Sequence, residues 1–200
     1  MVFSSPVFIY IFMPVFLISY YIGIASVVLI TPSKASIYPE YIPDAFNKIP
    51  VGQNRNYQNF VDLLKQYDVQ YLDGHEITMK QKRKSEYPLF CRGGTHWNYL
   101  GAYFTTREMI LKLQELVNRS ITNLECTRIE LDDIPSGSDN DLALLLNVWR
   151  TPDRYPVPHP VITAAPGGFQ PNVLFVGGQL FRTDYPDSGS KRGMLRHLLL

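Results

Sequence analysis

The sequence has no strong excess of charge of either sign. Nineteen lysine and arginine residues stand against eighteen aspartate and glutamate residues, which leaves a formal net charge of +1 at pH 7. No run rich in lysine and arginine is interleaved with aromatic residues, and such a run is the electrostatic footprint of a nucleic-acid-binding protein. We therefore expect no nucleic-acid partner.

Cysteine is also scarce. Cys91 and Cys126 lie far apart and belong to no CxxC or Cys/His pattern, so a zinc site is not predicted. An extracytoplasmic location would permit one disulfide between them, and the alternative is two buried thiols. The chain has no cluster of carboxylates and histidines at ligand spacing and no glycine-rich phosphate loop. Neither a metal nor any other cofactor is predicted.

The first part of the chain contains no charged side chain, and Lys34 is the first to appear. The 24 residues from Val7 to Ile30 are long enough to cross a hydrocarbon core, which takes about 20. Gly23 interrupts this run, and the β-branched residues after it end in Thr-Pro, a pattern typical of a buried strand. The sequence therefore predicts a hydrophobic membrane segment at 1–23 and a core strand at about 25–30.

The membrane segment has the features of an anchor rather than of a cleaved signal peptide. No lysine or arginine precedes Val7, whereas a signal peptide begins with a basic region. We expect one main domain at 24–200, membrane-anchored and located in the periplasm or otherwise outside the cytoplasm. A buried core helix at 1–23 is the alternative.

Hydrophobic periodicity predicts two helices and two further strands. Apolar residues recur at helical spacing from Asn56 to Tyr67, with Asn56 placed to cap the helix, and again at 98–118. Short apolar runs predict strands at 69–72 and 171–178. Strands that are apolar on both sides and alternate with helices indicate a parallel sheet covered on two faces, an α/β sandwich.

Two further segments carry local signals. Ser138 and Asp141 match a capping box ahead of a helix, DLALLLNVW. The proline-rich stretch 151–168 is expected to be irregular, because proline fixes φ and lacks the N–H donor.

His96 is the main candidate for chemistry, since it lies just ahead of the helix predicted near Asn98. The positive end of the helix dipole favours a neutral imidazole, the form in which a general base begins its cycle. The alternative is structural, with His96 and Trp97 capping and stapling the helix and Trp97 packing on the core. No carboxylate lies two residues before the histidine, because Gly94 occupies that position. Asp73 could orient His96, or could cap the chain locally after its strand.

The turn after the last predicted strand is where an α/β hydrolytic fold mounts a nucleophile and an oxyanion pocket. Gly177 and Gly178 are placed to form that pocket, and Gln179 occupies the nucleophile position. An amide is not a nucleophile. The nearby hydroxyls and the remaining histidines are expected to be structural or solvent-exposed: Thr183, Ser188, Ser190, His75, His159 and His197.

Five blocks of the sequence resemble, in order, the SGNH-hydrolase-like domain of the AlgX/AlgJ family of polysaccharide O-acetylation proteins. They are VVLITPSKASIYPEYIP (27–43), NFVDLLKQYDVQYLDG (59–74), YPLFCRGGTHWNYLGAY (87–103), SDNDLALLLNVW (138–149) and NVLFVGGQLF (172–181). The resemblance implies a three-layer α/β/α sandwich with a parallel sheet, truncated at its start. It also implies acetyl transfer to an exopolysaccharide such as alginate in the bacterial periplasm.

The family uses a serine nucleophile and an Asp-x-His-Trp motif. The motif's histidine and tryptophan correspond to His96 and Trp97, whereas Gly94 replaces its aspartate and Gln179 replaces the serine. Trp97 and Asn98 are expected to contact the sugar polymer. The residues at 94 and 179 predict an acetyltransferase-type domain that is impaired in catalysis. The alternatives are a non-catalytic polysaccharide-binding protein, a membrane-anchored interaction partner of the same pathway, and a nonfunctional remnant.

The first 22 residues resemble the amino terminus of membrane-bound O-acyltransferases that work in the same acetylation pathways. We therefore expect a junction between the start of such a protein and a truncated SGNH-like domain, and a membrane-bound O-acyltransferase as a possible partner of the chain.

Overall fold

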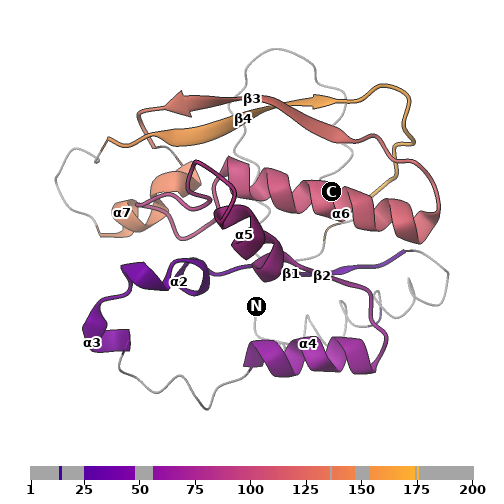
Figure 1. Ribbon diagram of the computed structural model, residues 1–200, viewed down its shortest axis with the longest axis horizontal. Helices are drawn as coiled ribbons and strands as arrows, with labels where there is room; N and C mark the ends of the chain where they lie inside the picture. The colour runs from indigo at the N-terminus through magenta and orange to yellow at the C-terminus, as the bar shows by residue number, and fades with distance from the viewer. Residues whose placement is uncertain are drawn as a thin grey trace.

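The computed structural model describes the chain at Pro14 and at residues 25–47, 56–135, 137–146, 154–173 and 175 (Figure 1). Apart from Pro14, the predicted membrane segment at 1–23 lies outside this described part. So do Leu174 and residues 176–178 of the predicted strand at 171–178, together with Gln179; residues 171–173 and 175 are described and form no strand. No helix within the described ranges is long and apolar enough to span a bilayer.

A pair of parallel strands lies at the centre of the molecule. β1 (Val28–Ile30) pairs with β2 (Tyr71–Asp73), with Val28 opposite Tyr71 and Ile30 opposite Asp73. β1 confirms the strand predicted at 25–30, and β2 begins at Tyr71 rather than at 69. Because the strands are parallel, both end at the same edge of the sheet, where α/β folds place their ligands.

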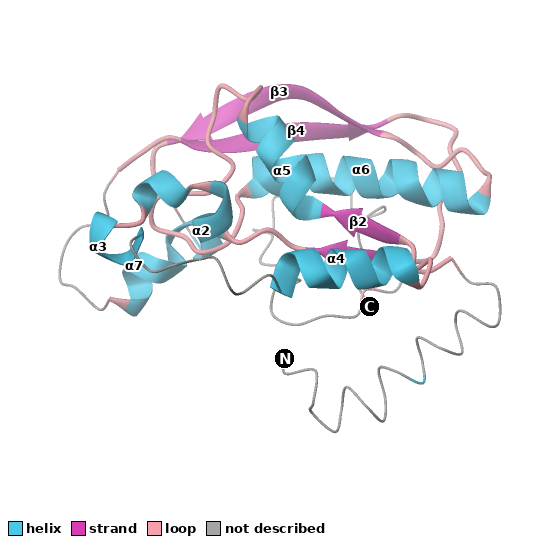
Figure 2. Ribbon diagram, turned by 60° about the horizontal axis from the view of Figure 1, so that its bottom comes forward, coloured by secondary structure: helices cyan, strands magenta, loops and turns pink. Residues whose placement is uncertain are grey.

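Two helices cover the two faces of this pair. In both views α4 (Asn56–Gln66) lies on one face and α6 (Tyr99–Val117) on the other (Figures 1 and 2). Val61 and Leu64 of α4 are buried, as the apolar spacing of the sequence predicts. The helix–sheet–helix order confirms the predicted α/β architecture, with a two-stranded parallel sheet in the part of the chain that is described.

Both ends of α6 follow from the sequence. The Asn98 side chain accepts a hydrogen bond from Gly101 N at 3.0 Å, which satisfies a donor of the first turn. Asn118 ends the helix in the left-handed conformation, with φ of 49°, a conformation that asparagine adopts more readily than most residues.

The core joins α6 to the chain segments on either side of β2. Its buried members form one cluster of Ile37, Tyr38, Leu89, Phe90, Leu100 and Tyr103. Tyr38 meets Phe90 edge-on, with ring centroids 6.0 Å apart, and its hydroxyl accepts a hydrogen bond from Leu89 N at 3.0 Å. This bond satisfies a buried backbone donor just ahead of His96, so the core and the candidate site share a segment.

An antiparallel pair of strands forms a further layer that the sequence did not predict. β3 (Leu124–Asp132) pairs with β4 (Val157–Ala164), and β4 contacts α6 on the side away from the parallel pair (Figure 2). The expectation that 151–168 is irregular is therefore wrong for Val157–Ala164. Among the described residues β4 pairs with β3 alone, and proline is tolerated in such an edge strand, where Pro158 and Pro160 lie.

Shorter helices connect these layers. They are α2 (Lys34–Ile37), η2 (Pro39–Tyr41), α3 (Asp44–Asn47), α5 (Gly74–Lys82), η4 (Gly137–Asn140) and α7 (Asp141–Leu145). The capping box predicted from Ser138 and Asp141 is wrong: Ser138 lies within η4, and Asp141 is the first residue of α7. The carboxylate of Asp141 is instead used by another segment of the chain, described below.

The cysteines are not joined. Cys91 is a buried free thiol and Cys126 is a half-buried free thiol on β3. The disulfide alternative is therefore wrong, and of the two thiols only Cys91 is fully enclosed.

Candidate active site

The candidate histidine lies at the end of a closed loop, residues 91–96, which we call the histidine loop. Phe90 and Trp97 form an isolated antiparallel bridge at its base, and Asn98 N donates to Leu89 O at 2.9 Å. Because Leu89 and Phe90 belong to the buried core, the two ends of the loop are fixed. The loop leads directly into the first turn of α6.

His96 is paired with a carboxylate from a distant part of the sequence. Its Nδ1 lies 2.8 Å from Oδ2 of Asp141, the first residue of α7. The two side chains are 35% and 27% exposed, so the pair is partly shielded and still reachable from solvent. Nε2 of His96 has no hydrogen-bond partner among the described residues, which leaves it available to a substrate. A histidine held in this way can act as a general base.

Asp141 binds the histidine loop at several points. Thr95 N donates to Oδ1 at 2.7 Å, and the Thr95 hydroxyl donates to Oδ2 at 2.6 Å. Burial alone would raise the pKa of Asp141, but the hydrogen bonds from Thr95 and His96 outweigh it and hold the pKa below its ordinary value. The carboxylate is therefore ionised at neutral pH.

Lys34 binds the histidine loop through three of its backbone carbonyls. Its ammonium group donates to the carbonyls of Cys91 at 2.6 Å, Arg92 at 2.9 Å and Gly94 at 2.8 Å. Burial lowers the pKa of Lys34, and the neighbouring groups Cys91 and Asp141 oppose that shift. Lys34 begins α2, shortly beyond the end of β1, so the loop lies near the carboxyl edge of the parallel pair.

Tyr155 and the buried Asp139 bind the loop through further hydrogen bonds. The Tyr155 hydroxyl accepts from Gly93 N at 3.0 Å and donates to Asp139 O at 2.8 Å. The Cys91 thiol donates to Asp139 Oδ1 at 3.1 Å, while Asp139 Oδ2 is buried without a partner among the described residues. Asp139 is 2% exposed, and burial raises the pKa of its carboxyl group.

The predicted site residues are distributed unevenly around this loop. Gly94 is buried within it, and its carbonyl is bound by Lys34. Trp97 is half-buried and packs on the core. Asn98 is 1% exposed, and its amide group donates to Pro88 O at 2.7 Å besides capping α6, which favours a structural role for it. Gly177, Gly178 and Gln179 lie outside the described residues.

Asp73 is occupied elsewhere. It caps α5 through Glu76 N at 3.0 Å and accepts a hydrogen bond from the Tyr57 hydroxyl at 2.5 Å. Burial, followed by this carboxylate, raises the pKa of Tyr57. Asp73 is therefore a local cap, and the carboxylate that contacts His96 is Asp141.

Two of the other histidines have local contacts. His75 Nδ1 lies 3.2 Å from Ser36 Oγ, and the His75 ring packs beside Tyr57 with centroids 5.2 Å apart. The His159 ring packs beside Tyr99 with centroids 5.1 Å apart. His197 lies outside the described residues.

Sequence reasoning missed Lys34, Asp141 and Tyr155 as site residues. Lys34 and Asp141 both fall within blocks that resemble the family, but nothing in their spacing joins them to His96. Asp141 and His96 lie 45 positions apart in the sequence, and the packing of α7 against the histidine loop brings them together.

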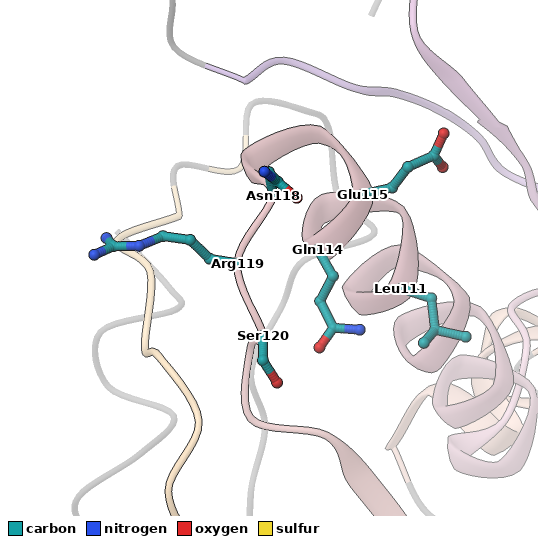
Figure 3. Close-up of a pocket in the computed structure, with 6 residues that line it drawn as sticks. All are labelled: Leu111, Gln114, Glu115, Asn118, Arg119 and Ser120. Carbon is teal, nitrogen blue, oxygen red and sulfur yellow. The ribbon is translucent and has the colours of Figure 1, made fainter.

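A shallow cavity of about 390 Å³ lies at the other end of α6, away from His96. Figure 3 shows Arg119 and Glu115 extending away from each other on opposite sides of it. The cavity is lined by Leu111, Gln114, Glu115, Asn118, Arg119 and Ser120. No hydrogen-bonded pair of a nucleophile and a base is found among these residues. We therefore place the candidate site at the histidine loop.

The described fold and site define an α/β domain with a histidine–carboxylate pair suited to acid–base chemistry. The family model of the SGNH hydrolase-like domain of acetyltransferase AlgX matches residues 21–169, which is most of the chain. The protein belongs to this family, which confirms the resemblance found in the sequence. The match contains the whole histidine loop and the residues that bind it, Lys34, Asp141 and Tyr155, and it ends before Gln179.

One solved structure with similarity to the chain is the O-acetyltransferase domain of Pseudomonas putida AlgJ. The two are 18% identical with a TM-score of 0.45, over 70% of this chain and 48% of that one. The chain thus spans about half the length of that structure. No curated protein matches the sequence significantly.

Proposed function

We propose that this domain serves the O-acetylation of an exopolysaccharide of the alginate type, with His96 as the general base. Membership of the AlgX family supports this assignment. The observation that carries it is the His96–Asp141 pair, because it presents an exposed imidazole nitrogen beside a fixed carboxylate.

In this role Nε2 of His96 accepts the proton of a hydroxyl group as that hydroxyl attacks an acetyl ester, and it returns the proton to the alcohol that leaves when the ester bond breaks. The imidazolium that forms is stabilised by the ionised carboxylate of Asp141. The attacking hydroxyl belongs either to a serine of the domain or to the sugar acceptor. With glutamine at position 179 the first route is closed, so we propose that the natural chain is impaired in forming an acetyl-enzyme.

A non-catalytic role in polysaccharide binding is the second candidate. The residue that favours it is Gln179, since an amide cannot attack an ester. In this case the half-buried ring of Trp97 offers a flat face to a sugar ring, and the loop serves recognition rather than turnover.

We also propose that residues 1–23 anchor the chain in a membrane, with the domain outside the cytoplasm and a membrane-bound O-acyltransferase as a partner. The uncharged composition of this segment supports the proposal. Alkaline extraction of membranes from cells that express the chain tests it. Recovery of the full chain in the soluble fraction contradicts it.

The catalytic role is tested with the full-length chain and a chromogenic acetyl ester. Three proteins are compared: the natural chain, Gln179→Ser, and Gln179→Ser combined with His96→Ala. We expect activity in Gln179→Ser alone, and a loss of about 10²- to 10⁴-fold when His96 is removed from it.

Two outcomes contradict this assignment in different ways. Activity of the natural chain that depends on His96 shows that position 179 does not supply the nucleophile. If no variant is active although each is folded, the binding role is favoured, and it is then checked by sedimentation of the natural chain with the polymer.

A further inference from the structure

The histidine loop is contacted by an acid that the sequence motif lacks, Asp141 of α7. We infer that Asp141 is the positioning carboxylate of His96 and takes the role that an acid at position 94 would have. The inference rests on the contact between His96 and Asp141. What the inference implies for turnover rests on the proposed function.

The first step concerns the proton on the imidazole. An ionised carboxylate accepts hydrogen bonds and cannot donate them. At 2.8 Å from Asp141 Oδ2, Nδ1 of a neutral His96 must therefore carry the proton. Nε2 then carries the lone pair, as a general base requires. The Thr95 hydroxyl also lies 3.1 Å from Nδ1 but can donate or accept there, so the acceptor-only carboxylate is the contact that selects this tautomer.

The second step concerns the stability of this geometry. α7 is joined to the histidine loop through Leu142 N, which donates to Gly93 O at 2.9 Å. A Cβ atom at Gly93 would lie 2.3 Å from Asn140 Oδ1, so a larger residue at this position would require the Asn140 side chain to move. Gly93 and the docking of α7 thus keep Asp141 within reach of His96.

The charged groups around the pair fit the same role. Lys34 of α2 faces the pair from across the loop, and its positive charge interacts favourably with the Asp141 carboxylate. Asp139 of η4 is the other nearby acid, but its Oδ1 accepts from Cys91 rather than from His96. Among the described residues, Asp141 is therefore the acid that contacts His96.

A purely local role for Asp141, as a cap of α7, does not account for its partners. A capping carboxylate binds N–H groups of its own helix. One donor to Asp141 does belong to α7, namely Leu142 N at 2.8 Å from Oδ1. The other contacts come from Thr95 and His96 on the histidine loop.

The test reads the tautomer of His96 directly and needs no activity. The full-length chain is labelled with ¹⁵N-histidine, and His96→Ala assigns the resonances. We expect the Nδ1–H tautomer in the natural chain and a mixture of the two tautomers in Asp141→Asn, because an amide can present either a donor or an acceptor to Nδ1. Asp132→Asn, at an exposed aspartate on β3, is the matched control and should leave the tautomer unchanged.

An unchanged tautomer in Asp141→Asn overturns the inference, and so does an Nε2–H tautomer in the natural chain. Should Asp141→Asn fail to fold, Asp141→Glu decides, since a glutamate retains an acceptor-only group. The Nδ1–H form is expected there, and the Nε2–H form would count against Asp141.

A second arm measures turnover in the Gln179→Ser background. Adding Asp141→Asn should lower kcat by about 10²- to 10⁴-fold with a smaller effect on KM, while Asp132→Asn changes neither. If Gln179→Ser is inactive, the proposed function fails, and the tautomer result still decides the role of Asp141. A changed tautomer with undiminished turnover refutes the catalytic consequence of the inference.

Discussion

Removing the ammonium group of Lys34 should destabilise the protein, because this one side chain binds three carbonyl groups of the histidine loop. Lys34→Met keeps a side chain of similar length and removes the charge. Two of the three hydrogen bonds, to Cys91 O and Gly94 O, are partly buried, and the third, to Arg92 O, is exposed. The exposed bond should contribute little.

A hydrogen bond from a charged donor contributes about 1.5–3 kcal/mol, so two partly buried ones at the low end contribute about 3 kcal/mol. The cost of burying the ammonium group, visible in the lowered pKa of Lys34, offsets part of this. We therefore expect the free energy of unfolding to fall by about 2 kcal/mol.

Urea denaturation of the full-length chain measures this change. With a slope of about 2 kcal/mol per molar, the midpoint should fall by roughly 1 M. Lys112→Met removes a lysine that makes a surface ion pair with Glu115 at 3.2 Å, and its midpoint should stay within about 0.3 M of the natural chain. Amide exchange across residues 91–95 should also accelerate in Lys34→Met and not in Lys112→Met. Coincident midpoints for the two variants would refute the reasoning.

Asn98→Ala removes the cap of α6 at Gly101 N and should cost about 2 kcal/mol in chemical denaturation; a cost below about 0.5 kcal/mol would show that water replaces the cap. Gly101→Ala places a Cβ 2.8 Å from the Leu89 carbonyl oxygen and should cost about 1–3 kcal/mol, and an unchanged melting temperature contradicts this. Burial raises the folded-state pKa of Asp139, so its stabilising contribution is full below the unfolded pKa of about 4 and is lost as pH rises through the folded pKa. Asp139→Asn should therefore lose less stability than the natural chain as pH rises above about 4 in urea titrations, and parallel pH profiles would disprove the assignment.

The helices that bury an apolar stripe could be predicted from the sequence. Leu100 and Tyr103 recur at the spacing that places them on one face of α6, and Asn98 carries the side chain that caps its first turn. These signals are local, because each involves residues a few positions apart. The parallel pair was also predictable, since Val28–Ile30 is an apolar, β-branched run that ends at a turn.

The segment at Pro158 and Pro160 shows where local signals fail. Proline is excluded from the interior of a sheet but not from an edge strand. Only the pairing with β3 decides which of these two cases applies to Pro158 and Pro160. The same holds for the cysteines, whose separation in space depends on where β3 lies relative to the histidine loop.

The sequence by itself determined the family, the helix that follows His96, and the absence of an acid at position 94. The tertiary structure alone decided that an acid is nevertheless present, because the docking of α7 places Asp141 2.8 Å from the imidazole. A hydrogen bond depends on the distance between two groups in space and is indifferent to their separation along the chain. A motif records a carboxylate only when it lies close in sequence, and here the contact is made across 45 positions by the close approach of Gly93 to the segment before α7.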